Sequence, residues 1–183
     1  MARDVGQLYT AGADRLAHRA PSDEALDAAL EGCGLGPFRS VLELGGAIGE
    51  FTEMLAPRCE RLTRIDVSAT AAAMARRRLV DFPRVEVVRG AIPDAIPDRE
   101  YDLVVASEIL YFLDTDAFER TLATVRARLL TGGRFVVVHW RTEESTRLFA
   151  AGDVHARLRD DPWLKPLHTE STPDFMLDVL ERG

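Results

Sequence analysis

The chain of 183 residues has few of the features that mark secreted or membrane-bound proteins. It has only two cysteines, Cys33 and Cys59, without CxxC spacing or a neighbouring histidine cluster, so we expect reduced structural thiols and no metal site. Residues 1–10 are polar and lack the apolar core of a signal peptide. No apolar run approaches the roughly 20 residues that span a bilayer. These absences predict a cytoplasmic protein without a membrane partner.

A surplus of basic residues is also missing. The net charge is −7, and an acidic surface repels a phosphate backbone, so a nucleic acid is not an expected partner. The run of three arginines at 76–78 is expected to be a solvated helix face. With 46% hydrophobic and 29% charged residues, the composition is that of an ordinary globular protein. The length suits one domain with a sizeable core.

Alternating apolar patterns predict strands and helices in turn. Five short apolar or β-branched runs are typical of strands in a covered parallel sheet: residues 41–44, 62–67, 85–89, 102–107 and 134–140. Helical spacing occurs at residues 50–56, at 69–80 after Ser68 as N-cap, and after Asp114 or Thr115 as N-cap. Thr131-Gly132-Gly133 is expected to stop the last of these helices. Residues 91–98 hold two prolines, which argues against a long helix there.

The last part of the chain predicts a different arrangement. Residues 142–161 have a broadly helical pattern with an interruption at Gly152. Two extended segments follow, at about 165–171 and 175–181, and the few residues between them are too short for a parallel crossover, so they should form an antiparallel hairpin. A further helix is expected around residues 22–31.

The predicted fold class is therefore α/β, a doubly wound Rossmann-like sheet that is mostly parallel and ends in an antiparallel hairpin. We expect one domain over residues 1–183. Residues 1–32 would form an N-terminal lid and helix, and residues 38–183 the cofactor-binding core.

Open α/β sheets bind ligands beyond the carboxyl ends of their strands, and candidate residues lie there. Asp66 ends the second strand, 21 residues after Gly45, close to the ~20-residue spacing at which an acid reaches ribose hydroxyls. The loop after the first strand lacks the dinucleotide pattern G-x-G-x-x-G, because Ala47 and Glu50 stand at its second and third glycine positions. Glu43 would repel a pyrophosphate and attract the ammonium group of S-adenosylmethionine, directly or through water. We expect that cofactor; the alternative is a glycine-rich turn with a buried acid.

The same residues carry a family resemblance. Glu43-x-Gly45-x-x-x-Gly49, with Phe51-Thr52 and then Ile65-Asp66-Val67-Ser68, resembles motif I and the following acid of class I S-adenosylmethionine methyltransferases. Within that superfamily the chain is most similar to the nodulation N-methyltransferase (NodS) group. The residues that carry this likeness are SEILYFL at 107–113, HWR at 139–141, GDVH at 152–155 and FMLDVL at 175–180. The resemblance covers residues 41–182.

The resemblance implies a set of cofactor contacts from the strand ends and an N-terminal lid. They are Glu43, Gly45, Gly46, Ala47, Gly49, Asp66, Val67, Ser68, Gly90, Ala91, Ile92, Ser107 and Tyr9. Ala47 replaces the middle glycine of the motif, which predicts a negative φ at that position. The third strand end lacks the usual aspartate for the adenine amino group, so backbone contacts of residues 90–92 are expected instead. Thr131 replaces the usual proline before Gly132-Gly133.

Four side chains are candidate catalytic residues on the acceptor side. Glu108 follows the fourth strand, and Tyr111 would share its face if this stretch is one helical turn. The alternatives are that Glu108 is a polar rim residue or a helix-cap acid, and that Tyr111 only packs. His139 ends the fifth strand, where the alternative is a core histidine bonded to backbone. His155 either folds over the pocket or is a solvated helix residue. An acid or a histidine can take the proton that an amine must lose before it attacks a methyl group.

These observations predict methyl transfer to a small-molecule acceptor. The NodS likeness implies the amine of an amino sugar or glycosyl compound. An O-methyltransferase for a small hydroxyl compound is the alternative enzyme, with His139 or His155 as base and Glu108 orienting it. A cofactor-binding accessory module is the alternative that is not an enzyme. A dehydrogenase is the least expected function, because the loop lacks the dinucleotide glycine pattern. The sequence leaves the oligomeric state open.

Overall fold

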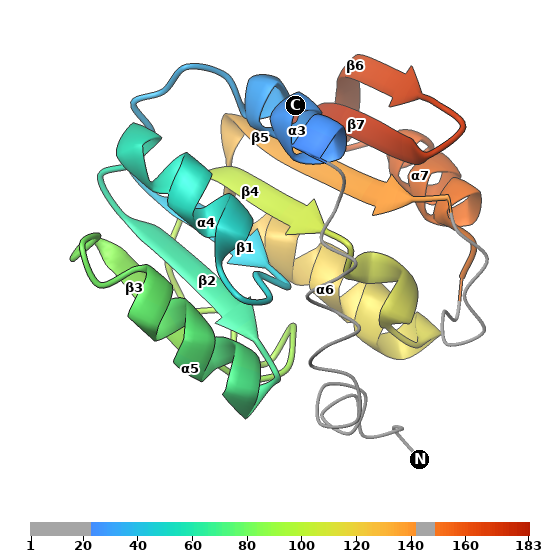
Figure 1. Cartoon of the computed structure of the whole chain (residues 1–183). Coiled ribbons are helices and arrows are strands. Elements are labelled where there is room, and N and C mark those ends of the chain that lie inside the picture. Colours follow the sequence, from blue (N-terminus) through green and yellow to red (C-terminus); the bar gives the residue numbers. More distant parts are fainter. Residues whose placement is uncertain (1–22, 142–148) are drawn as a thin grey trace.

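The computed structural model describes residues 23–141 and 149–183, which form a seven-stranded sheet between layers of helices (Figure 1). The strand order is β3-β2-β1-β4-β5-β7-β6. The strands are β1 (Val41–Leu44), β2 (Leu62–Asp66), β3 (Val85–Arg89), β4 (Tyr101–Ser107), β5 (Leu129–Trp140), β6 (Leu164–Ser171) and β7 (Phe175–Arg182).

The pairing of the strands confirms the predicted fold class. Strands β1 to β5 are mutually parallel, while β7 pairs antiparallel with both β5 and β6. The order of the sheet reverses between β1 and β4, because β1 leads to β2 on one side and β4 to β5 on the other. At such a reversal the loops diverge and leave a crevice beyond the carboxyl ends of the strands, which is where ligands bind in this architecture.

Helices cover both faces of the sheet. Helices α3 (Asp23–Cys33), α4 (Glu50–Leu55) and α5 (Ala69–Arg78) lie on one face, and α6 (Thr115–Arg128) and α7 (Ala151–Arg159) on the other (Figure 1). Two short 3-10 turns, η1 (Ala56–Arg58) and η2 (Leu110–Phe112), complete the described elements. Ser68 and Asp114 are the N-caps of α5 and α6, as predicted, since their side chains accept backbone N–H groups of Ala71 and Ala117.

Each face of the sheet has its own apolar core. On the α3 and α4 side, Val41 and Leu103 pack with Phe51 and Leu55; on the α6 side, Leu42 and its neighbours pack with the stripe of α6. The stripe consists of Phe118, Leu122 and Val125. Because successive strand residues point to opposite faces, the apolar runs of the strands supply both cores. Among the described residues, no helix is long and apolar enough to cross a membrane.

Two predicted boundaries were wrong. Helix α6 ends at Arg128, and β5 already begins at Leu129, so Thr131-Gly132-Gly133 lies inside the strand rather than after the helix. The pairing of Leu129 with Tyr101 extends the strand backwards, with a register shift before Leu103. Gly152 does not interrupt a helix, because it lies in the first turn of α7, where a glycine disturbs few helical hydrogen bonds. Residues 142–148 and the N-terminal lid lie outside the described residues.

Candidate cofactor and acceptor site

The loop between β1 and α4 is shaped by glycine. Gly45 and Gly49 have φ values of +75° and +88°, in the left-handed region where residues with a Cβ are strained. The N–H groups of Gly45 and Gly46 both donate to the carbonyl of Ile65 on β2, at 3.0 and 3.2 Å. A Cβ at position 45 would lie 2.7 Å from the Cβ of Ile109, which follows β4. The loop therefore sits tightly across the switch point of the sheet.

The predicted negative φ of Ala47 was wrong, because its φ is +42°. Two side chains of β2 hold this residue from both sides. Its N–H donates to Asp66 Oδ2 at 3.0 Å, and Arg64 Nη2 donates to its carbonyl oxygen at 2.5 Å. A strained backbone conformation persists where the surrounding contacts over-determine it. The contacts with Arg64 and Asp66 thus stabilise a left-handed conformation that a glycine would adopt without strain.

Three charged side chains are buried under the glycine loop, on the α4 face of the sheet. Glu43 and Arg64 are neighbours in the register of β1 and β2, and Arg64 Nη2 lies 3.8 Å from Asp66 Oδ2. Their exposed fractions are 1%, 0% and 5% for Glu43, Arg64 and Asp66. Burial raises the pKa of both carboxyl groups above their ordinary values. The positive charge of Arg64 opposes that rise at both, as do the hydrogen bonds from Thr52 to Glu43 and from the Ser68 N–H to Asp66.

This charge balance selects the kind of ligand that the loop can accept. Two carboxylates against one guanidinium leave one negative charge beside the loop when both acids are ionised. A cationic ligand would be stabilised there, whereas a pyrophosphate would meet an anion at short range. Arg64 Nε and Nη1 have no hydrogen-bond partner within the described ranges, so part of the buried cation is held by charge alone. The residues present therefore fit a ligand with an ammonium and a sulfonium group.

The other predicted cofactor contacts lie at the same edge of the sheet. Ser68 caps α5, and Val67 beside it is partly exposed. The Gly90 N–H donates to the Asp66 carbonyl at 3.0 Å, which ties the end of β3 to the end of β2. Ala91 is exposed and Ile92 is half-buried in the turn that follows, and Ser107 ends β4. Tyr9 lies outside the described residues.

Glu108 and Tyr111 meet, as their spacing predicted. Glu108 follows β4 with a φ of +56°, and its carboxylate accepts the backbone N–H of Trp140 at 2.6 Å. The Tyr111 hydroxyl donates to the same carboxylate from η2. Together with Ala47, Glu108 is one of the two residues other than glycine that have a positive φ in the described part of the chain. Both lie at the carboxyl edge of the sheet, where strain is commonly associated with a functional site.

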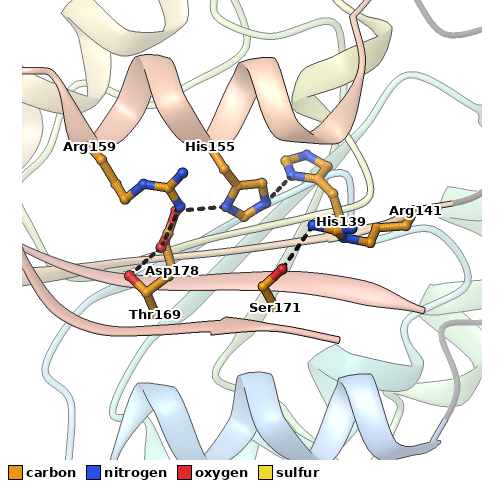
Figure 2. A network of polar contacts seen from close by, with 7 residues as sticks. All are labelled: His139, Arg141, His155, Arg159, Thr169, Ser171 and Asp178. Carbon is orange, nitrogen blue, oxygen red and sulfur yellow. Dashed lines mark hydrogen bonds and ion pairs between the residues drawn. The ribbon is translucent and has the colours of Figure 1, made fainter. Parts of the chain in front are cut away.

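The two candidate histidines also come together, on the α7 face of the sheet. His139 Nδ1 lies 3.1 Å from His155 Nε2, and His155 Nδ1 lies 2.8 Å from Asp178 Oδ2 (Figure 2). The alternative of a solvated His155 was wrong, since its side chain is fully buried. The ring of Tyr111 packs against that of His139 at a tilt of 47°, with centroids 4.6 Å apart, which joins the histidines to Glu108. Arg64 and Asp178 were not singled out by sequence reasoning.

The close fit at Gly45 leads to a first prediction. Replacing Gly45 by alanine imposes a left-handed alanine, at about 1–2 kcal/mol, and adds a contact with Ile109 that cannot be accommodated without moving the loop. We expect the affinity for S-adenosylhomocysteine to fall by at least about tenfold in calorimetric titration.

Gly132→Ala is the matched control for Gly45→Ala. Gly132 has a φ of +76°, but a Cβ there meets no atom within 4 Å. We expect the same backbone strain in thermal unfolding and an affinity within about twofold of the unchanged protein. Equal losses of affinity in the two variants would contradict the assignment of the loop.

Comparison with known proteins gives a consistent result. The family model of Nodulation protein S (NodS) matches residues 22–147. Nodulation protein S of Sinorhizobium fredii is 40% identical over 86 residues, which are 47% of this chain and 40% of that protein. Nodulation protein S of Rhizobium tropici is 37% identical over 102 residues, which are 56% of this chain and 43% of that protein. The matched segments thus span less than half the length of either relative.

A solved structure extends the likeness to the whole fold. The N-methyltransferase NodS of Bradyrhizobium japonicum WM9, in complex with S-adenosyl-l-homocysteine, superposes with a TM-score of 0.77 and 25% identity. The superposition covers 87% of this chain and 86% of that one. The doubly wound sheet, the glycine loop and the acid at the end of β2 are features of the class I methyltransferase fold. The chain belongs to the nodulation protein S (NodS) family.

Proposed function

We propose that this protein transfers a methyl group from S-adenosylmethionine to the nitrogen of a small amine, with an amino sugar or glycosyl amine as the acceptor. The observation that carries the proposal is the arrangement of two clusters along one edge of the sheet. The anionic glycine loop lies at the end of β1, and Glu108 with Tyr111 lies at the end of the neighbouring β4. A cofactor on the first cluster would face an acceptor on the second.

The first cluster would hold the cofactor. Gly45, Gly46, Ala47 and Gly49 give close backbone approach, and Asp66 would accept the ribose hydroxyls. Glu43 would contribute negative charge near the ammonium group from beneath the loop. The adenine would lie between the ends of β2 and β3, against Val67, Ser68, Gly90, Ala91 and Ile92, and Ser107 would line the edge near β4. Tyr9 is proposed as a lid residue. The bound cofactor supplies an electrophilic methyl group on its sulfonium sulfur.

The second cluster would hold and deprotonate the acceptor. Glu108 is half-buried and already accepts two hydrogen bonds, from Tyr111 and from the Trp140 N–H, so its carboxylate is fixed in direction. An ionised carboxylate can bind a cationic amine through a charge-assisted hydrogen bond and then take its proton. His139 and His155 lie behind Tyr111 and are proposed as additional proton acceptors. An amine therefore suits this side of the site.

One observation favours O-methylation as a second candidate. The two histidines are buried and in contact, and His155 also contacts Asp178, as expected of a base that must remove a proton from a hydroxyl group. In that reading Glu108 would orient the hydroxyl. An accessory module without turnover would not require any arrangement of these side chains, so their convergence argues for an enzyme.

Matched acceptors distinguish the two candidate reactions. We expect an alkyl 2-amino-2-deoxyglycoside to be methylated, and the same glycoside with a 2-hydroxyl or an N-acetyl group to react at least about 10²-fold more slowly, because neither presents an amine lone pair. Initial rates from the formation of S-adenosylhomocysteine measure this. Faster reaction of the hydroxyl compound would replace N-transfer by O-transfer.

A further inference from the structure

Gly46, in the loop between β1 and α4, lies directly against the guanidinium group of Arg64. Unlike Gly45 and Gly49, it does not have a positive φ, so its backbone conformation does not require glycine. A Cβ at position 46 would lie 2.6 Å from Arg64 Nε and 3.0 Å from Arg64 Nη2, closer than non-bonded atoms pack. The Arg64 side chain is 0% exposed and cannot swing out into solvent. Glycine at position 46 therefore makes room for the arginine.

The guanidinium group closes a ring of contacts around Ala47. Arg64 Nη2 donates to the Ala47 carbonyl oxygen at 2.5 Å, and the Ala47 N–H donates to Asp66 Oδ2 at 3.0 Å. The ring is completed by the distance of 3.8 Å between Arg64 Nη2 and the same oxygen of Asp66. Both polar backbone atoms of Ala47 are thus held, and the position of its N–H in turn fixes the direction of the Asp66 carboxylate.

The Asp66 carboxylate keeps acceptor capacity for a ligand. An ionised carboxylate has about four acceptor positions. Within the described residues, Oδ2 accepts the Ala47 N–H and Oδ1 accepts the Ser68 N–H at 2.8 Å, which leaves a position on each oxygen. The two neighbouring hydroxyls of a ribose would donate to these positions. Burial raises the pKa of Asp66, while the Ser68 N–H and the charge of Arg64 oppose that rise and favour the ionised form.

We propose that Arg64 is a positioning residue for the cofactor ribose. Its guanidinium group holds Ala47 in the left-handed conformation from which the Ala47 N–H directs the Asp66 carboxylate toward the ribose hydroxyls. Arg64 does not touch the cofactor itself, because its side chain is enclosed beneath the loop. The inference rests on the proposed function for the contact between Asp66 and the ribose, and it is independent of the identity of the methyl acceptor.

Attraction between charges does not account for an arginine at this position. S-adenosylmethionine carries a net positive charge, which a cation beneath the loop repels. Arg64 Nε and Nη1 have no hydrogen-bond partner within the described ranges, and unsatisfied donors of a buried cation are costly. In the same ranges, the hydrogen bond that the guanidinium group does make is the one to the Ala47 carbonyl. The cost is explained if that contact holds the loop in its binding conformation.

The preference for ribose can be measured without an acceptor. The probes are S-adenosylhomocysteine and its 2′,3′-dideoxy analogue, compared by competitive calorimetric titration of the full chain. Gly46→Ala pushes the guanidinium group aside without removing its charge, and we expect the preference for the ribose ligand to fall by at least about fivefold. A clash of the new Cβ with the ligand would weaken both probes alike and leave the preference unchanged. An unchanged preference would overturn the inference, whereas the expected fall without any amine turnover would overturn only the proposed function.

A rescue experiment separates positioning from a merely structural role. Arg64→Met, checked for folding by circular dichroism, should lose the ribose preference as Gly46→Ala does. Adding Ala47→Gly lets the loop adopt the left-handed conformation without strain, so it should raise the preference at least about threefold more in Arg64→Met than in the unchanged protein. Arg134→Met is the matched control, because Arg134 Nη1 donates to the Cys33 carbonyl at 2.9 Å away from the loop, and it should leave the preference unchanged. Equal effects of Ala47→Gly in the two backgrounds would contradict the positioning role.

Discussion

Replacing Arg64 by methionine should lower the free energy of unfolding by about 3–5 kcal/mol at neutral pH. The exchange keeps a side chain of similar length but removes the buried cation between Glu43 and Asp66. It also leaves the carbonyl of Ala47 without its donor, although that residue stays in the left-handed region. Removing one partner of a buried charge cluster leaves the others uncompensated, which costs more than the cluster contributes as a whole.

The loss in Arg64→Met should grow with pH. Burial already raises the pKa of Glu43 and Asp66, and without Arg64 both values rise further. A carboxyl group with a raised pKa in the folded state favours folding below its unfolded value, which is near 4.5 for Glu43 and 3.8 for Asp66. That contribution is lost as the pH rises through the folded value. Urea unfolding of Arg64→Met and of the unchanged protein at about pH 5 and pH 8 therefore measures the loss of stability and the direction in which it changes with pH.

An exposed arginine is the control for the buried one. Arg120→Met breaks ion pairs with Asp94 and Asp116 at the surface, where the side chain is 50% exposed, and should cost under about 1 kcal/mol at any pH. If Arg64→Met were as stable as Arg120→Met at pH 8, the buried cation would have no role in holding the loop.

Glu108→Gln should lower kcat by about 10²-fold and leave the affinity for S-adenosylhomocysteine within about twofold. Glutamine preserves the shape and can still accept from the Trp140 N–H, but it cannot take a proton or stabilise a cationic amine. The defect should shrink as the pH rises and the acceptor amine becomes neutral in solution, because the enzyme then has less deprotonation to perform. Single-turnover rates over a range of pH test this.

Asp116→Asn is the matched carboxylate control for Glu108→Gln. Its side chain is 82% exposed in the first turn of α6, and we expect kcat to stay at the wild-type value. A Glu108→Gln protein that turns over at the wild-type rate across the pH range would remove Glu108 from the acceptor site.

The elements that follow from apolar periodicity or from a local sequence pattern could be predicted from the sequence. The parallel strands, the hairpin and the caps at Ser68 and Asp114 follow from apolar spacing and local hydrogen bonding, and the structure confirms them. The start of β5 was missed, because Thr131-Gly132-Gly133 looks locally like a helix stop, whereas pairing with β4 keeps it in the strand. A long-range ladder contact outweighs local turn chemistry there.

The partners of the predicted site residues were less visible. Ala47 has a positive φ only because Arg64 and Asp66 hold it, and that contact depends on the packing of β2 against the loop. Arg64 and Asp178 did leave a signal, since each is a charge in the interior of a buried strand. Such charges are rarely tolerated without partners, so both could have been flagged. Which partners they have depends on the register of the sheet, which the sequence does not display.

The position of the transferred methyl group tests the central claim most directly. The protein would be incubated with S-adenosylmethionine carrying a carbon-13 methyl and with the 2-amino glycoside, and the product examined by nuclear magnetic resonance. The account predicts one labelled carbon bonded to nitrogen for each S-adenosylhomocysteine formed. A label bonded to oxygen, or S-adenosylhomocysteine formed without methylated amine, would contradict it.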